Sequence, residues 1–108
     1  MPHFMVQGSY TDDAWAKMIQ KPEDREKIYR GLIEKAGGKL KAFYFAFGDK
    51  DVVAILETPD SATAAALSLA VMAPGHVKHI STTPLMTTAE GMEVMKKAAA
   101  LKYKGPTG

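Results

Sequence analysis

The chain of 108 residues is long enough for one domain and too short for two, so we expect a single core over residues 3–100 with a tail over 101–108. Its 46% hydrophobic and 24% charged residues exclude a disordered chain, and a net charge of +2 is too close to balance to predict a nucleic-acid partner. Because it has no cysteine, it cannot form a disulfide framework, a thiolate nucleophile or a zinc ribbon.

Targeting and membrane signals are missing from the sequence. The first residues have no basic stretch leading into an apolar run of signal-peptide length. The longest apolar run, 62–73, is shorter than the roughly 18 residues that a membrane span requires. We therefore expect a cytoplasmic protein with no membrane partner.

Hydrophobic periodicity divides the chain into alternating strands and helices. In chain order we predict a strand over 3–10, helices over 14–19 and 22–36, strands over 39–47 and 51–57, a helix over 61–73, a strand over 77–84 and a helix over 87–101.

Local signals set several of these boundaries. Gly8 inside the first strand indicates a close approach by another backbone. Pro22 suits the first position of a helix, and Gly37 followed by another glycine suits a left-handed helix end. Thr87 and Glu90 form a capping-box pattern that opens the last helix. These signals support the predicted order of elements.

The order strand, helix, strand, strand, helix, strand, with an extra C-terminal helix, is typical of an α+β ferredoxin-like βαββαβ domain with an antiparallel four-stranded sheet. Right-handed connections then place the first and third strands in the centre and the second and fourth at the edges.

The second strand, at an edge of the predicted sheet, has apolar residues on both faces. Phe43, Phe45 and Phe47 alternate with Ala42 and Tyr44. Such an edge invites aggregation unless something covers it, and helices can cover only one face of the sheet. We therefore predict a homodimer, or a larger assembly of dimers, formed through the sheet.

The hairpin between the second and third strands carries a resemblance. Residues 37–45, 47–55 and 57–60 resemble the GYD-domain family of small bacterial and archaeal proteins, which is related to the dimeric α/β-barrel superfamily. Gly48 and Asp51 match the family signature, whereas Lys50 stands where its Tyr is expected. The resemblance implies a ferredoxin-like fold and a dimeric α/β-barrel-like assembly, and the family has no settled activity. From the turn itself we expect Asp51 to accept hydrogen bonds from turn amides.

Histidines are candidates for proton transfer. His79, on the predicted fourth strand, is a weak catalytic candidate with a side chain suited to acid–base work, although it could equally touch solvent or a neighbouring subunit. His76 is expected on the surface, and it lies three positions from His79, so the two point to opposite strand faces and we predict no metal site. His3 could join His79 in a composite site within a dimer.

Amphipathic rings and polar groups on a central strand are candidates for a ligand pocket. Tyr10, Trp15 and Tyr44 could wall a cavity, or pack in the core with their polar tips at the surface. Gln7 and Ser9 lie on a central strand, where buried polar groups need partners. The full set of pocket candidates is Gln7, Ser9, Tyr10, Trp15, Tyr44 and His79.

The C-terminal helix carries methionines and lysines. Met92 and Met95 are at helical spacing, which is typical of core packing. Lys96, Lys97 and the lysines after them are typical of a solvated helix end, and they lack the interleaved aromatic residues of a nucleic-acid interface.

Two functions are compatible with these features. The first is a homo-oligomeric module for assembly or for binding a small apolar or aromatic ligand, with a modest pocket near Tyr10, Trp15, Tyr44 and His79. The alternative is a cofactor-independent enzyme of the dimeric α/β-barrel type, a monooxygenase or isomerase acting on a small aromatic substrate, with His79 or a tyrosine as acid or base. We expect no cofactor; haem with His79 as axial ligand is a more distant variant.

Overall fold

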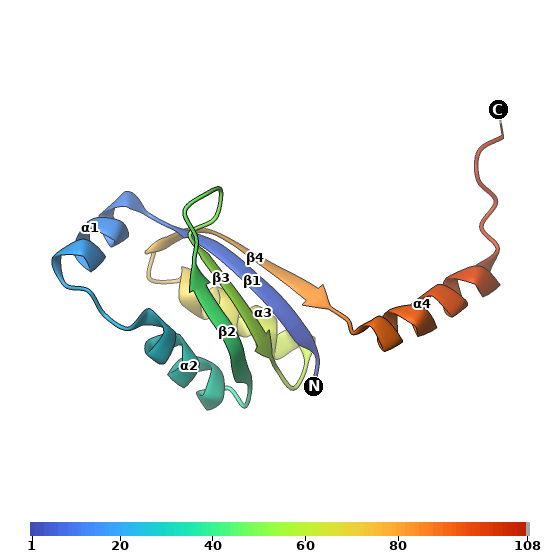
Figure 1. Ribbon diagram of the computed structural model, residues 1–108, viewed down its shortest axis with the longest axis horizontal. Helices are drawn as coiled ribbons and strands as arrows, with labels where there is room; N and C mark the ends of the chain where they lie inside the picture. Colours follow the sequence, from blue (N-terminus) through green and yellow to red (C-terminus); the bar gives the residue numbers. More distant parts are fainter. Residues whose placement is uncertain (108) are drawn as a thin grey trace.

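The computed structural model describes residues 1–107, which form a four-stranded antiparallel sheet with four helices (Figure 1). The strands are ordered β2-β3-β1-β4, so β1 and β3 are central and β2 and β4 are edges, as predicted. This is a ferredoxin-like α+β arrangement. The elements are β1 (His3–Tyr10), α1 (Asp12–Gln20), α2 (Arg25–Lys35), β2 (Lys39–Phe45), β3 (Val52–Glu57), α3 (Ser61–Met72), β4 (Val77–Leu85) and α4 (Thr88–Leu101).

Most predicted boundaries shift by one to three residues, and two of these shifts have a local cause. Helix α2 begins at Arg25 rather than at Pro22, because the Asp24 carboxylate accepts a hydrogen bond from the Lys27 amide at 3.1 Å and caps the helix there. Strand β2 ends at Phe45, before the predicted end, because a hydrogen bond from the next amide, that of residue 46, to the carbonyl of residue 51 closes the hairpin loop. The loop between β2 and β3 is therefore longer than the sequence indicated.

Two glycines allow close backbone approaches. A Cβ atom on Gly8 would lie 3.2 Å from the His79 carbonyl oxygen of the neighbouring strand, which confirms the predicted approach. A Cβ atom on Gly38 would lie 2.5 Å from the carbonyl oxygen of Glu57. Gly37, with a φ of 86°, supplies the left-handed end of α2. Gly37 and Gly38 thus shape the connection from α2 to β2, and Gly8 lets β1 and β4 approach each other.

The core lies on one face of the sheet, beneath α2 and α3. On β1, Phe4 and Val6 are buried there, and Ala54 and Leu56 of β3 lie beside them. Helix α2 contributes Ile33, which is fully buried. The complete cluster is Phe4, Val6, Ile33, Leu40, Ala54, Leu56, Ala64 and Leu67.

The opposite face of the sheet, which we call the open face, carries the residues that alternate with the core positions. It is apolar in the middle, where the half-buried Met5 and Ile55 are register partners on the two central strands. Tyr44 on β2 is 67% exposed. The residues of the open face are His3, Met5, Gln7, Lys39, Ala42, Tyr44, Val53, Ile55, Glu57, His79, Ser81, Thr83 and Leu85.

Helix α4 extends away from the sheet instead of packing against it (Figure 1). Every residue of Thr88–Leu101 is described, and none of them is buried. The radius of gyration is 17.5 Å, against about 13 Å expected for a compact domain of this length. Met92 and Met95 are 54% and 70% exposed, so the prediction that they are core residues is wrong. Their spacing identified an apolar helix face but not what covers it.

Among residues 1–107, no helix has the length and apolar character needed to cross a membrane.

Candidate functional site

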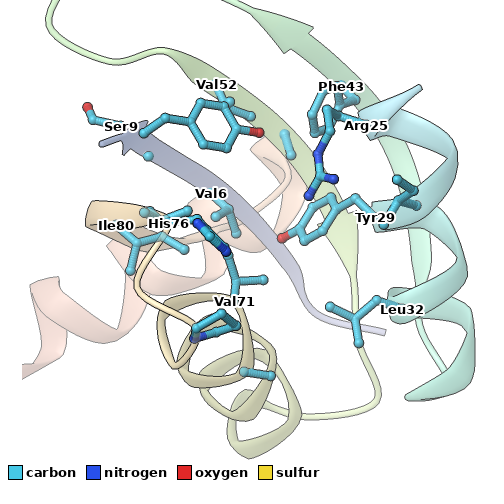
Figure 2. A pocket seen from close by; sticks show the side chains of 17 residues that line it. Val6, Ser9, Arg25, Tyr29, Leu32, Phe43, Val52, Val71, His76 and Ile80 are labelled. Carbon is cyan, nitrogen blue, oxygen red and sulfur yellow. The ribbon is translucent and has the colours of Figure 1, made fainter. Parts of the chain in front are cut away.

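A cavity of about 250 Å³ lies between the sheet and the two helices α2 and α3 (Figure 2). It exists because α2 packs against the edge strand β2 and α3 against the opposite edge strand β4, which leaves space over the central strands. Gly8 and Ala54 form part of the sheet side of this space, and they leave it open because their side chains are absent or small. The other apolar wall residues are Val6, Ile28, Leu32, Phe43, Val52, Ala70, Val71, Pro74, Val77 and Ile80.

Polar side chains reach the cavity from both sides. Arg25 and Tyr29 come from successive turns of α2, and His76 comes from the loop before β4 (Figure 2). Tyr10, at the end of β1, also lines the cavity. Together they place one guanidinium, two phenols and one imidazole around a largely apolar space.

Burial affects the ionisation of both phenols. Burial and, as a smaller contribution, the neighbouring Tyr10 together raise the pKa of Tyr29 to about 12. Burial also raises the pKa of Tyr10, although hydrogen bonding to Arg25 and its positive charge act in the opposite direction. Both phenols therefore stay protonated at neutral pH and act as hydrogen-bond donors or acceptors there, not as bases.

Arg25 is only partly neutralised by its neighbours. Its Nη1 donates to Oε2 of Glu23 at 3.3 Å, and its side chain is 34% exposed. The Nε atom is buried and has no hydrogen-bond partner among residues 1–107. A buried donor without a partner costs free energy, so an acceptor that reached this guanidinium edge would be stabilised there.

An outer groove adjoins the cavity. The two share Tyr10, Arg25 and His76, and the groove adds Lys17 and Lys21 among its lining residues. The shared residues therefore stand between the outer groove and the apolar interior.

The loop between β2 and β3, which holds Gly48 and Asp51, links the end of β1 to α1. Asp51 Oδ2 accepts from the Tyr10 amide at 2.9 Å and from Trp15 Nε1 at 3.2 Å, and the Asp51 amide donates to the Gly8 carbonyl at 2.8 Å. We expected this carboxylate to accept from amides of its own turn. Instead, it bonds to residues on the neighbouring elements, because the hairpin loop folds over the end of β1. Gly48 lies in the exposed part of that loop.

Trp15 is the centre of an aromatic cluster behind the cavity. Its ring centroid lies 5.4 Å from that of Tyr10, with an edge-to-face geometry. It lies 6.1 Å from Phe45 and 6.5 Å from Phe47. Asp51 and these rings together hold Trp15, which in turn supports the Tyr10 ring at the cavity.

The structure divides the six pocket candidates between two regions. Tyr10 lines the cavity and Trp15 packs against it, whereas Ser9 borders the cavity at the end of β1 and its hydroxyl donates to the Asp49 carbonyl. Gln7, Tyr44 and His79 lie on the open face instead, where Gln7 is the register partner of Val53 and Ser81. His79, the acid–base candidate, is thus on the side of the sheet away from the cavity, which separates it from the phenols.

Three residues at the cavity were not among the pocket candidates. Arg25 and Tyr29 are four positions apart on α2, on the same helix face as the stripe residue Leu32, so this spacing was the signal that could have found them. His76 was expected only as a surface residue of the loop. Nothing in the sequence indicated that this loop borders a cavity.

His3 pairs with a carboxylate on the open face. Its Nε2 lies 2.8 Å from Oε1 of Glu57. Because His79 pairs with Ser9 at the other end of β1, about 20 Å of strand separates the two histidines within one chain. A composite site would therefore need a second copy. Residues 1–107 hold no group of three or more His, Asp or Glu side chains that could bind a metal.

Comparisons with known proteins agree with this architecture. A family model described as GYD domain matches residues 4–95. A relative from Thermus thermophilus, named "Glutamine synthetase and cystathionine beta-lyase binding protein", is 30% identical over 102 residues, which cover 94% of this chain and 100% of the relative. The crystal structure of MtbAldR is similar with a TM-score of 0.58 and 13% sequence identity; the match covers 80% of this chain and 53% of that one. This last likeness concerns the fold alone.

Proposed function

We propose that this chain, which belongs to the GYD-domain family, is a homodimeric binding module in which two open faces pack together. The observation that carries the proposal is the open face itself, whose centre is apolar and lies on the side of the sheet opposite to the helices that form the core. The family membership and the relative named as a binding protein support a binding or assembly role.

A second copy of the sheet matches the open face in shape and chemistry. Two sheets pack face to face at about 10 Å, with apolar side chains interdigitating at the centre. Ile55, Val53 and Met5 would occupy that centre, and polar side chains such as Ser81 and Thr83 would lie toward the β4 edge. In this arrangement Tyr44 would also be shielded from water.

The protruding helix α4 suits the same assembly. Its apolar side chains, including Met92 and Met95, have no cover within the part of the chain that the structure describes. A helix that leaves from the edge strand β4 is placed to lie against the neighbouring subunit. We therefore assign α4 to the dimer interface together with the open face.

A protein partner is the second part of the proposal. The relative is named for binding glutamine synthetase and cystathionine beta-lyase, and it matches this chain over its full length. We infer that this chain also binds an enzyme of one of these two kinds. The cavity beneath α2 and α3 is where a small apolar or aromatic ligand would bind.

Native mass spectrometry tests the assembly. We expect a dimer for the wild type and a monomer for Ile55→Glu, because the two copies of the new carboxylate would face each other in an apolar interface. Ile19→Glu is the matched control: Ile19 lies on α1, is 75% exposed, and should leave the dimer unchanged.

A monomeric wild type at micromolar concentration would refute the dimer. Adding glutamine synthetase or cystathionine β-lyase from Thermus thermophilus to the same sample tests the partner. A complex with either enzyme supports the protein-binding role, and the absence of both complexes contradicts it.

A further inference from the structure

The mouth of the cavity combines a cationic side chain with an apolar interior. We propose that the cavity binds small organic carboxylates end-on, with the carboxylate against Arg25 and the apolar body among the walls. This inference rests on the proposed ligand cavity and names the chemical class of its ligand.

Arg25 keeps an unpartnered donor. Glu23 accepts from its Nη1 and the Tyr10 hydroxyl lies beside the guanidinium, whereas the buried Nε has no partner within residues 1–107. The Nε edge of a guanidinium offers two parallel N–H groups that match the two oxygens of a carboxylate. A bound carboxylate would satisfy the buried donor without displacing Glu23.

The charge of the lining favours an anion. All seventeen lining residues lie in the described part of the chain; Arg25 is cationic, His76 adds an imidazole, and none is an Asp or Glu. Lys17 and Lys21 line the adjoining groove, opposed there by Glu23. This distribution attracts anions toward the mouth and repels cations.

The protonated phenols of Tyr10 and Tyr29 complete the polar end. Each can donate a hydrogen bond to an acceptor, and neither adds negative charge near Arg25 at neutral pH. An anionic head is thus met by donors, whereas a cationic head would meet no carboxylate among the residues that line the cavity.

The volume and walls define the body of the ligand. About 250 Å³ corresponds to the space of about eight water molecules, and it lies just below the range of drug-sized pockets. Val6, Leu32 and Ile80 line it with hydrocarbon. A branched aliphatic chain or a single aromatic ring fits these limits, whereas a sugar would leave its hydroxyl groups without partners.

Isothermal titration calorimetry with matched probes tests the inference on the full-length protein. The probes are isovalerate, phenylacetate and the neutral phenylacetamide. We expect both acids to bind, and phenylacetate to bind at least about tenfold more tightly than the amide, as for a hydrogen bond to a charged group. Arg25→Gln should remove that difference.

Arg30→Gln is the control, because it removes the same charge from α2 at a residue that bonds to Glu26 and the Leu40 carbonyl and does not line the cavity. It should bind phenylacetate as the wild type does. If Arg25→Gln does not fold, Arg25→Lys replaces it; it keeps the charge but loses the paired donors and should show weaker binding of both acids.

The results separate the carboxylate inference from the proposed ligand cavity. If phenylacetate and phenylacetamide bind equally, the ligand cavity stands and the carboxylate inference falls. If neither acid nor the amide binds at millimolar concentration, the cavity proposal falls as well. Methyl chemical shifts locate the site: changes at Val6, Val71 and Ile80 support it, whereas changes confined to Val53 and Ile55 on the open face overturn it.

Discussion

At the scale of single residues, Asp51 holds three parts of the chain together. Its carboxylate joins the end of β1 to α1 through the Tyr10 amide and Trp15 Nε1. Asp51→Ala would leave both donors without this acceptor, so we expect the free energy of unfolding to fall by about 1–3 kcal/mol. The fluorescence of Trp15, which is the only tryptophan, should change at the same time.

Asp49→Ala is the matched control in the same loop. Within residues 1–107, Asp49 accepts a hydrogen bond through its backbone carbonyl alone, from Ser9 Oγ at 3.3 Å, and an alanine keeps that carbonyl. Its stability should stay within about 0.5 kcal/mol of the wild type in urea unfolding. Equal losses for the two variants would contradict the assigned role of Asp51.

At the scale of elements, α4 is stabilised by its own N-terminal cap and, in the proposed dimer, by packing against the neighbouring subunit. Thr87 and Glu90 exchange two hydrogen bonds of 3.1 Å in a capping box, as predicted. Because no α4 residue is buried in the described chain, a charge on its apolar face should not weaken the domain body. Such a charge should instead weaken the association of the two subunits.

We therefore expect Met95→Lys to raise the dissociation constant of the dimer by about tenfold or more, equivalent to about 1.4 kcal/mol. Thermal unfolding of the diluted monomer should be unchanged. Lys97→Gln, on the same helix, should leave both quantities as in the wild type. Analytical ultracentrifugation over a dilution series measures the constant, and an unchanged value for Met95→Lys would exclude α4 from the interface.

At the scale of the whole molecule, the buried phenol of Tyr29 limits stability at high pH. Its pKa is about 12 in the folded protein, against an ordinary value of 10.0. Folding thus favours the protonated form, so its contribution is complete below pH 10 and is lost as the pH rises from 10 to 12. The loss should be on the order of 2 kcal/mol.

Tyr29→Phe should remove this part of the alkaline destabilisation, because phenylalanine has no proton to lose. Tyr103→Phe, at an exposed position, should retain the wild-type profile. Urea unfolding at a series of pH values measures both. Parallel profiles for Tyr29→Phe and the wild type between pH 10 and 12 would contradict the assignment.

Much of this fold could be predicted because its signals are local. Periodicity located the eight elements. The cap at Thr87 set the start of α4, and Gly37 set the end of α2. The cavity could not be predicted, because it depends on how far apart α2 and α3 lie over the sheet, which is a matter of packing. Tyr10 was found from its strand position, whereas Arg25 was not, since an arginine in a helix usually faces water.

The family resemblance was confirmed over residues 4–95, but it did not reveal what its signature does. The Asp51 contacts span about forty positions in the sequence, so turn chemistry alone pointed to the wrong partners. Likewise, the apolar spacing in α4 was read correctly as a helix and incorrectly as core. Both errors come from tertiary placement, which periodicity does not encode.

The central position of β1 sets the order in which the chain can fold during synthesis. His3 pairs with Glu57 on one side and with Leu85 on the other, so the first strand of this sheet in chain order is among the last to be fully paired. Until then Phe4 and Val6 have no core to enter. The apolar side chains of β1 therefore stay without their sheet neighbours until the sequence of β3 and β4 has also been synthesised.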